Sequence, residues 1–109
     1  MLRATELTAG ERLLISRRRS EQTIADAAAY HATTEYRYRR WERDEEKGPD
    51  MRTGRLKFHE QSVIMRRRAN ASVAEFARLL DVSPWWLRQM ETGEAPDDRL
   101  RDYWTAAGA

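Results

Sequence analysis

The sequence predicts an all-α protein whose chain contains two similar halves. An ungapped internal match aligns residues 10–45 with residues 59–94, at an offset of 49. Each half contains helix-opening motifs followed by apolar residues at helical spacing. No segment alternates apolar and polar residues for long enough to predict a strand. We therefore expect two tandem helical domains, over residues 1–49 and 50–109.

The internal match does not depend on the many arginines alone. Apolar, small and acidic residues are also identical between the two copies. The identical pairs are Glu11/Glu60, Ile15/Ile64, Arg17/Arg66, Arg18/Arg67, Arg19/Arg68, Ala25/Ala74, Ala28/Ala77, Arg39/Arg88 and Glu42/Glu91.

In the second copy, the first helix of the predicted helix pair begins with a capping box. Ser72 and Glu75 are spaced so that the hydroxyl accepts from an orphan amide while the carboxylate reaches back. Asp81 ends this helix, since Asp tolerates a left-handed backbone better than most non-glycine residues. Its apolar stripe consists of Val73, Phe76, Ala77 and Leu80.

A second helix follows at once. Ser83 and Pro84 occupy the N-cap and first helical positions, where the missing proline amide costs nothing. Leu87 and Met90 are expected to be buried, and the helix ends near Gly93.

The first copy follows the same plan. Thr8 and Glu11 form a capping box that opens a helix reaching Arg19. Thr23 and Thr34 open the next two helices. The inward face of the last of these helices carries Tyr38 and Trp41.

Three further segments complete the expected organisation. Residues 56–68 predict the first helix of the second copy, and the polar, glycine-containing segment 44–54 predicts a linker. Residues 97–106 predict a final short helix. The acidic runs 44–46 and 97–98 are interpreted as solvated loop or helix-start charge. The final helix is expected to bury Leu100, Tyr103 and Trp104.

Composition argues against several classes of protein. The chain has no cysteine and only two histidines, His31 and His59, so we expect no metal, no cofactor and no enzyme activity. No apolar run approaches the roughly 20 residues of a membrane span, and the expected location is the cytoplasm. All but two of the 20 basic residues are arginine, although the net charge is only +2. Arginine suits guanine edges and phosphates better than lysine does.

Residues 72–94 of the second copy resemble the helix-turn-helix of the Cro/C1-type (XRE-like) repressor family. The resemblance rests on Ala77 where two helices cross, on Asp81 at the usual turn glycine, and on a helix that ends in hydrophobic-Glu-x-Gly. The first copy is similar at fewer positions, with His31 where an aliphatic residue is usual. The positions that fit in the first copy are Ala28, Ala32, Thr33, Tyr38, Trp41 and Glu42.

This resemblance implies a fold and one internal contact per copy. The fold is two tandem lambda-repressor-like helix-turn-helix domains. Family members pair an arginine of the first helix with the glutamate near the end of the recognition helix, which implies the pairs Arg17/Glu42 and Arg66/Glu91. The remaining arginines of the two triplets are interpreted as solvated helix ends, namely Arg18, Arg19, Arg67 and Arg68.

The resemblance also implies double-stranded DNA as a partner, read in the major groove by the second helix of each pair. In the first copy the expected DNA-binding residues are Thr34, Tyr36, Arg37, Arg39, Arg40 and Arg43. In the second copy they are Ser83, Trp85, Arg88, Gln89 and Thr92. Arginine can read guanine and glutamine can read adenine.

Some residues depart from the family pattern. Ile24 and Val73 replace the glutamine that usually touches a phosphate, and Glu35 would repel one. Trp85 and Trp86 are adjacent, so both cannot face inward on one helix. Three interpretations of this pair stay open: a DNA contact, a surface for another protein, or packing of the two copies on each other.

Two functions follow as alternatives. The first is a sequence-specific transcriptional regulator, of phage or mobile-element type, whose two recognition helices read adjacent major grooves. Such a chain could act as a monomeric pseudo-dimer or as a homodimer. The second is an adaptor or antiactivator that uses one or both helix-turn-helix folds to bind a protein.

Overall fold

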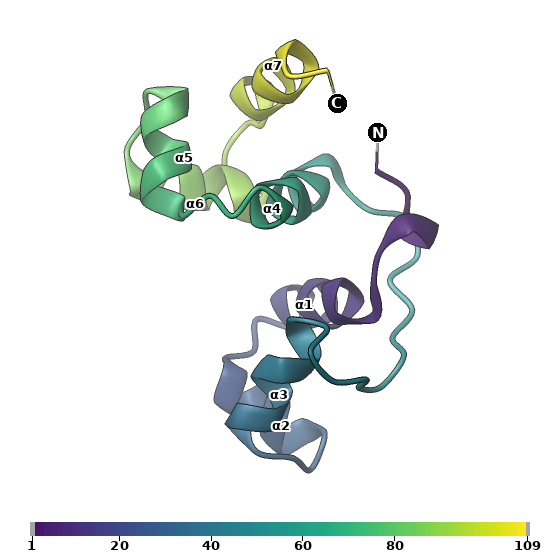
Figure 1. The fold of residues 1–109 in the computed structure, drawn as a ribbon. Coiled ribbons are helices and arrows are strands. Elements are labelled where there is room, and N and C mark those ends of the chain that lie inside the picture. The colour runs from purple at the N-terminus through teal and green to yellow at the C-terminus, as the bar shows by residue number, and fades with distance from the viewer. Residues whose placement is uncertain (1, 109) are drawn as a thin grey trace. The chain divides into compact units, whose positions relative to one another are not determined.

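The computed structural model describes residues 2–108, which contain seven α-helices, one short 3-10 helix and no strand. The all-α prediction is therefore confirmed for this range. The chain divides into two compact units, Leu2–Arg55 and a second that begins at Leu56 (Figure 1). The first unit contains η1 (Ala4–Glu6), α1 (Ala9–Arg19), α2 (Ile24–Tyr30) and α3 (Glu35–Glu42). The second contains α4 (Phe58–Arg68), α5 (Val73–Leu80), α6 (Pro84–Thr92) and α7 (Asp98–Ala106).

The two units end their helices in the same way. Within residues 2–108, every non-glycine residue with a positive φ lies at or just beyond the end of a helix. These residues and Gly93 form three pairs separated by the offset of the sequence repeat, namely Glu21/Asn70, Ala32/Asp81 and Asp44/Gly93. Asp81 has φ 57°, which confirms the left-handed turn predicted for it.

The predicted helix starts are also confirmed. At five helix N-termini a hydroxyl oxygen accepts a hydrogen bond from the backbone amide three residues later. The five N-cap residues are Thr8, Thr23, Thr34, Ser72 and Ser83. At one of them the backbone amide of Ser72 donates to the Glu75 carboxylate, and this bond lowers the pKa of Glu75.

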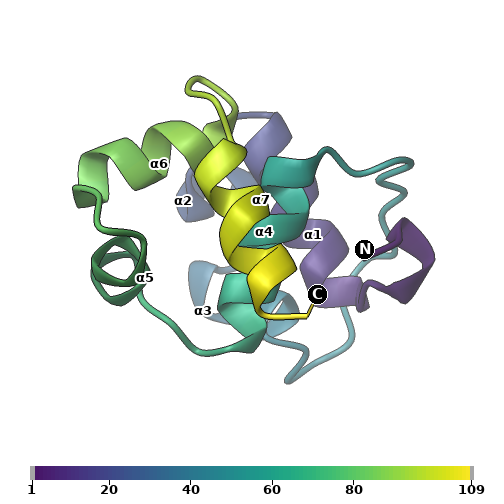
Figure 2. The same cartoon turned by 90° about the horizontal axis from the view of Figure 1, so that it is seen from above.

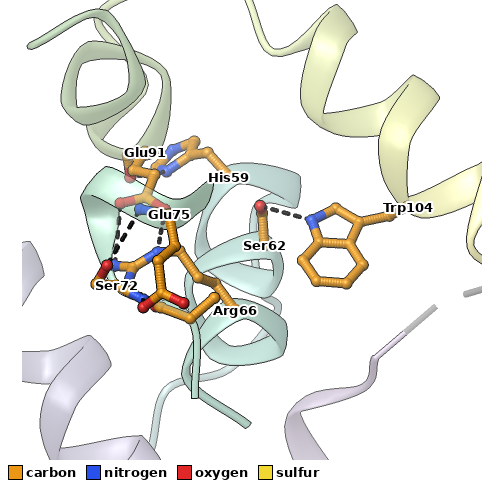
Figure 3. Close-up of polar contacts among 8 residues, drawn as sticks. His59, Ser62, Arg66, Ser72, Glu75, Glu91 and Trp104 are labelled. Carbon is orange, nitrogen blue, oxygen red and sulfur yellow. Dashed lines mark hydrogen bonds and ion pairs between the residues drawn. The ribbon is translucent and has the colours of Figure 1, made fainter. Parts of the chain in front are cut away.

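An arginine–glutamate pair connects the first helix of each unit to the end of the third. Arg17 Nε and Nη2 donate to the Glu42 carboxylate at 2.7 and 3.2 Å. Arg66 makes the same two bonds to Glu91 at 2.7 and 3.2 Å (Figure 3). In each unit the guanidinium also donates to a backbone carbonyl of the turn after the first helix. Both pairs implied by the family resemblance are thus confirmed.

The two units surround their cores with equivalent helices but fill them differently. The core of the first unit consists of Leu13, Ala27, Ala28, Tyr38 and Trp41. The core of the second consists of Phe58, Phe76, Ala77, Leu80, Leu87, Met90, Ala95, Leu100 and Trp104. The half-buried ring of His31, at the position of Leu80, lies 6.0 Å from that of Tyr38.

The second unit closes its core with α7, which packs against α4 and α5 (Figure 2). This helix confirms the final helix predicted over residues 97–106. The Trp104 indole donates to the Ser62 hydroxyl of α4 at 2.8 Å, in a buried position (Figure 3). In the first unit Met51, which is equivalent to Leu100, packs on the core from a segment without helix.

Arg19 corrects one expectation. It was expected to be a solvated helix end, yet its guanidinium donates to the backbone carbonyls of Thr53 and, at 3.1 Å, Arg55. Arg19 is exposed, whereas Arg18 and Arg67 are half-buried. The segment expected as a linker, residues 44–54, therefore packs on the first unit, which extends past the expected boundary at residue 49.

Asp44 adds to the expectation that the acidic run 44–46 is solvated loop or helix-start charge, because this exposed residue contacts the start of α1. Its carboxylate accepts from the Thr8 hydroxyl at 2.5 Å and from the Gly10 amide at 2.9 Å, and so adds to the cap of α1. The start of α1 comes close to Asp44 because Gly10 packs directly against the backbone at the end of α3. A Cβ at Gly10 would come within 2.5 Å of the Trp41 carbonyl oxygen.

Replacing Ala32 by glycine should stabilise the protein. Ala32 has φ 54°, a conformation that costs an L-residue about 1–2 kcal/mol, whereas glycine adopts it freely. Allowing for the greater chain entropy of glycine when unfolded, we expect a net gain of about 0.5–1 kcal/mol in urea unfolding. The matched control is Ala29→Gly, inside α2, which should cost about 0.5–1 kcal/mol. Two changes of equal sign would contradict the left-handed turn at Ala32.

Replacing Arg66 by methionine should destabilise the second unit by about 3–5 kcal/mol, because it removes the guanidinium that binds the buried Glu91 carboxylate through two hydrogen bonds. The Glu91 side chain is only 2% exposed. The measurement is urea unfolding followed by circular dichroism. The control Arg88→Met, at an exposed position of α6, should change stability by less than about 0.5 kcal/mol. The double variant R66M/E91Q should recover part of the loss, since it also removes the buried negative charge of Glu91.

Candidate nucleic-acid interface

The exposed face of α3 carries an aromatic ring and arginines. Successive helix residues turn by about 100°, so residues three or four apart share a face. Tyr38 and Trp41 are buried, and the opposite face consequently presents Tyr36, Arg40 and Arg43. We call these three residues the outer stripe of α3.

The same positions form an outer stripe on α6. Leu87 and Met90 are buried there, and the opposite face presents Trp85, Gln89 and Thr92. Each stripe residue of α6 lies 49 positions after its counterpart on α3. The two helices therefore offer chemically different side chains from equivalent places.

Two of the predicted DNA-binding residues serve as helix caps. The Thr34 hydroxyl accepts from the Arg37 amide at 3.1 Å, and the Ser83 hydroxyl accepts from the Trp86 amide at 3.0 Å. Both residues are exposed. In these bonds the hydroxyl oxygen is the acceptor, so the hydroxyl hydrogen of each residue can still be donated to another group.

Three arginines of α3 are paired with carboxylates. Arg37 contacts Glu46 at 3.1 Å, Arg39 contacts Glu35 at 3.6 Å, and Arg43 contacts Glu45 at 4.0 Å. Glu45 is exposed, as expected for a solvated loop charge, and Glu46 is half-buried; the arginine partners of both were not predicted. Because the pairs are exposed, each contributes about 0–1 kcal/mol, so another anion can replace the carboxylate at little cost.

Arg40 differs from these neighbours. It makes no ion pair within residues 2–108, and its guanidinium carbon lies 5.8 Å from the centre of the Tyr36 ring. Arg40 is half-buried, whereas Arg88 on α6 is exposed and has no ion pair in the described part of the chain. Gln89 is half-buried, and the Thr92 hydroxyl donates to its backbone carbonyl at 3.2 Å.

The buried arginine–glutamate pairs position both exposed helices. Glu42 is the last residue of α3, so its bond to Arg17 fixes this end against α1. Burial alone would lower the pKa of Arg17, but the hydrogen bond and charge of Glu42 outweigh it and raise that pKa. Burial, aided by the Glu42 charge, also raises the pKa of Tyr38. The Glu42 carboxylate, which contributes to both pKa shifts, is the same group that fixes the end of α3 against α1.

Trp85 and Trp86 are both exposed, at 62% and 39%. Their ring centres are 6.0 Å apart. Sequence analysis did not single out two other exposed side chains, Tyr30 at 72% and Leu79 at 63%. These two residues are equivalent under the repeat, so the offset was the signal that could have found them.

A metal site and a membrane-spanning helix are both absent from the described residues. No cluster of histidine, aspartate or glutamate side chains within residues 2–108 could hold a metal ion. Over the same range, no helix combines the length and apolar character that crossing a bilayer requires.

Acrylamide quenching of tryptophan fluorescence should separate the four tryptophans into two classes. Trp85 and Trp86 are exposed, whereas Trp41 and Trp104 are each 9% exposed. The double variant W85F/W86F should lose the readily quenched component. The control W104F should keep it. A quenchable fraction that survives W85F/W86F would contradict the exposure of the tryptophan pair.

Comparison with protein-family models, with curated proteins and with solved structures finds no match to this chain. The contacts and exposure of α3 and α6 are therefore the observations from which its function has to be inferred.

Proposed function

We propose that the protein is a sequence-specific, double-stranded DNA-binding transcriptional regulator made of two tandem helix-turn-helix domains. One observation carries the proposal: α3 and α6 occupy equivalent places in the two units, and each presents an outward stripe of base-reading residue types in which the middle residue is half-buried and its two neighbours are exposed. The stripes are Tyr36, Arg40 and Arg43 on α3, and Trp85, Gln89 and Thr92 on α6.

The chemistry of these stripes suits the major groove. An α-helix fits this groove, where guanine offers two acceptors and adenine offers one donor and one acceptor. Arg40 supplies donors only, and the Gln89 amide supplies both a donor and an acceptor. Thr34 and Ser83, at the helix N-termini, keep hydroxyl donors that could reach a phosphate.

The carboxylates around α3 oppose phosphate binding but do not exclude it. On binding, Arg37, Arg39 and Arg43 would exchange exposed carboxylate partners for phosphates or bases. The exchange gives up weak bonds for contacts that release counterions from the duplex. Glu35, near the start of α3, is the residue expected to reduce affinity most.

Two units in one chain make a dimer unnecessary for contacting two half-sites. Repressors of this type place two recognition helices about 34 Å apart, one turn of the duplex. Because α3 and α6 carry different residues, a single chain would read an asymmetric site as a pseudo-dimer. Such a regulator would act in the cytoplasm, on DNA of the nucleoid.

Replacing Arg39 and Arg40 by alanine should abolish specific DNA binding. The test is selection of bound duplexes from a random library at about 100 mM salt, because lower salt favours non-specific binding. The wild-type chain should enrich one site containing two dissimilar half-sites, and R39A/R40A should lose at least the half-site read by α3. The matched control R3A/R52A removes two exposed arginines outside α3 and should leave the enriched site unchanged. Retention of site affinity by R39A/R40A would overturn the assignment of α3.

A protein-binding adaptor is the alternative, favoured by the exposure of Trp85 and Trp86 at 62% and 39%. A pair of exposed tryptophans is costly unless a partner covers them. The low net charge and the carboxylates paired with α3 arginines point the same way. This function would give no enriched duplex, and partner binding would be lost in W85A/W86A but kept in R39A/R40A.

A further inference from the structure

The outer stripes of α3 and α6 differ in a way that bears on which bases they would read. One of the three stripe positions keeps its chemical class, since Tyr36 and Trp85 are both aromatic, whereas the cationic Arg43 is replaced by the neutral hydroxyl of Thr92. The middle position changes from a guanidinium, Arg40, to a carboxamide. That change converts a set of donors into a donor–acceptor pair.

We infer, on the basis of the proposed function, that the two units read half-sites of different composition. Arg40 binds a guanine in the first half-site and Gln89 binds an adenine in the second. Beside each of these bases stands a thymine whose methyl group packs on the exposed ring of Tyr36 or Trp85.

The position of Arg40 supports a guanine contact. Arg37 and Arg39 on the same helix are paired with carboxylates, whereas Arg40 lies against the Tyr36 ring. A ring contact leaves the N–H groups at the edge of the guanidinium available. Guanine O6 and N7 are two acceptors side by side, which match two of these donors.

The distance between the two groups is compatible with targets on neighbouring bases. The Arg40 guanidinium carbon lies 5.8 Å from the centre of the Tyr36 ring, and bases on one strand are stacked about 3.4 Å apart. The separation exceeds one base step, so the two side chains can contact successive base pairs. Tyr36 is 71% exposed, so its ring is accessible to a methyl group.

The second unit provides the corresponding pair with an amide. The Gln89 side-chain amide makes no hydrogen bond within residues 2–108, and Thr92 bonds only its backbone carbonyl. Adenine N6 donates and N7 accepts, so a carboxamide satisfies both atoms. Trp85 is 62% exposed at the position of Tyr36 and is again four residues before the reading side chain.

The test is a swap of the two reading residues, followed by duplex selection. The wild-type chain should enrich guanine in one half-site and adenine in the other, each next to a thymine. R40Q should convert the guanine to adenine, Q89R should convert the adenine to guanine, and R40Q/Q89R should exchange the two. At the swapped positions we expect the base preference to change by about tenfold or more.

A matched control and a second measurement make the test specific. R52Q makes the same chemical change at an exposed arginine outside α3 and should leave the base preference intact. Replacing the thymine of the first half-site by uracil removes only the methyl group and should weaken wild-type binding about fourfold. The variant Y36A should not distinguish thymine from uracil there.

The outcomes separate this inference from the function on which it rests. An enriched site whose composition does not respond to R40Q or Q89R would overturn the assignment of these residues and leave the DNA-binding function standing. Equal binding of thymine and uracil by the wild-type chain would overturn the aromatic contact. Failure of the wild-type chain to enrich any duplex would overturn both the inference and the proposed function.

Discussion

The bidentate arginine–glutamate pair is the interaction on which the position of each exposed helix depends. Arg17 and Arg66 bind the glutamate near the C-terminal end of α3 or α6, with the same two distances, 2.7 and 3.2 Å. Each guanidinium also binds a carbonyl of the turn after the first helix. One side chain thereby fixes three elements at once. A buried pair of this kind is weak evidence for net stability, but its geometry admits one arrangement and disfavours others.

The same arrangement of helices accommodates different core residues in the two units. Tyr38 in the first unit corresponds to Leu87 in the second, and His31 corresponds to Leu80, yet the left-handed turns fall at the same places. Met51, from a segment without helix, packs on the core of the first unit, whereas α7 covers that of the second. Caps, left-handed turns and the ion pair are short-range or strongly directional, so they repeat while the apolar filling changes. The outer stripes are free to differ for the same reason.

Much of this fold could be predicted from the sequence because its determinants are local. The Thr8 capping box and the left-handed turn at Asp81 depend on a few neighbouring residues, and both were predicted. The contacts that long side chains make with residues far away in the sequence were not predicted. The bonds from Arg19 to backbone carbonyls and from Asp44 to the start of α1 require tertiary positions that no local pattern encodes. For the candidate site, the inward and outward faces of α3 followed from helical spacing, but the carboxylate partners of its arginines did not.

Those carboxylates bear on how a nearly neutral protein could select a DNA site. Three arginines on or just after α3 form ion pairs with Glu35, Glu45 and Glu46. This helix therefore offers phosphates less free positive charge than its composition suggests. Non-specific binding depends on phosphate neutralisation and would therefore be weak. Under the proposed function, base contacts through Arg40, which has no ion pair within residues 2–108, would keep their full value because no carboxylate has to be displaced. Since a regulator must distinguish its site from a large excess of other sequences, lowering non-specific affinity raises the specificity ratio even where it reduces absolute affinity.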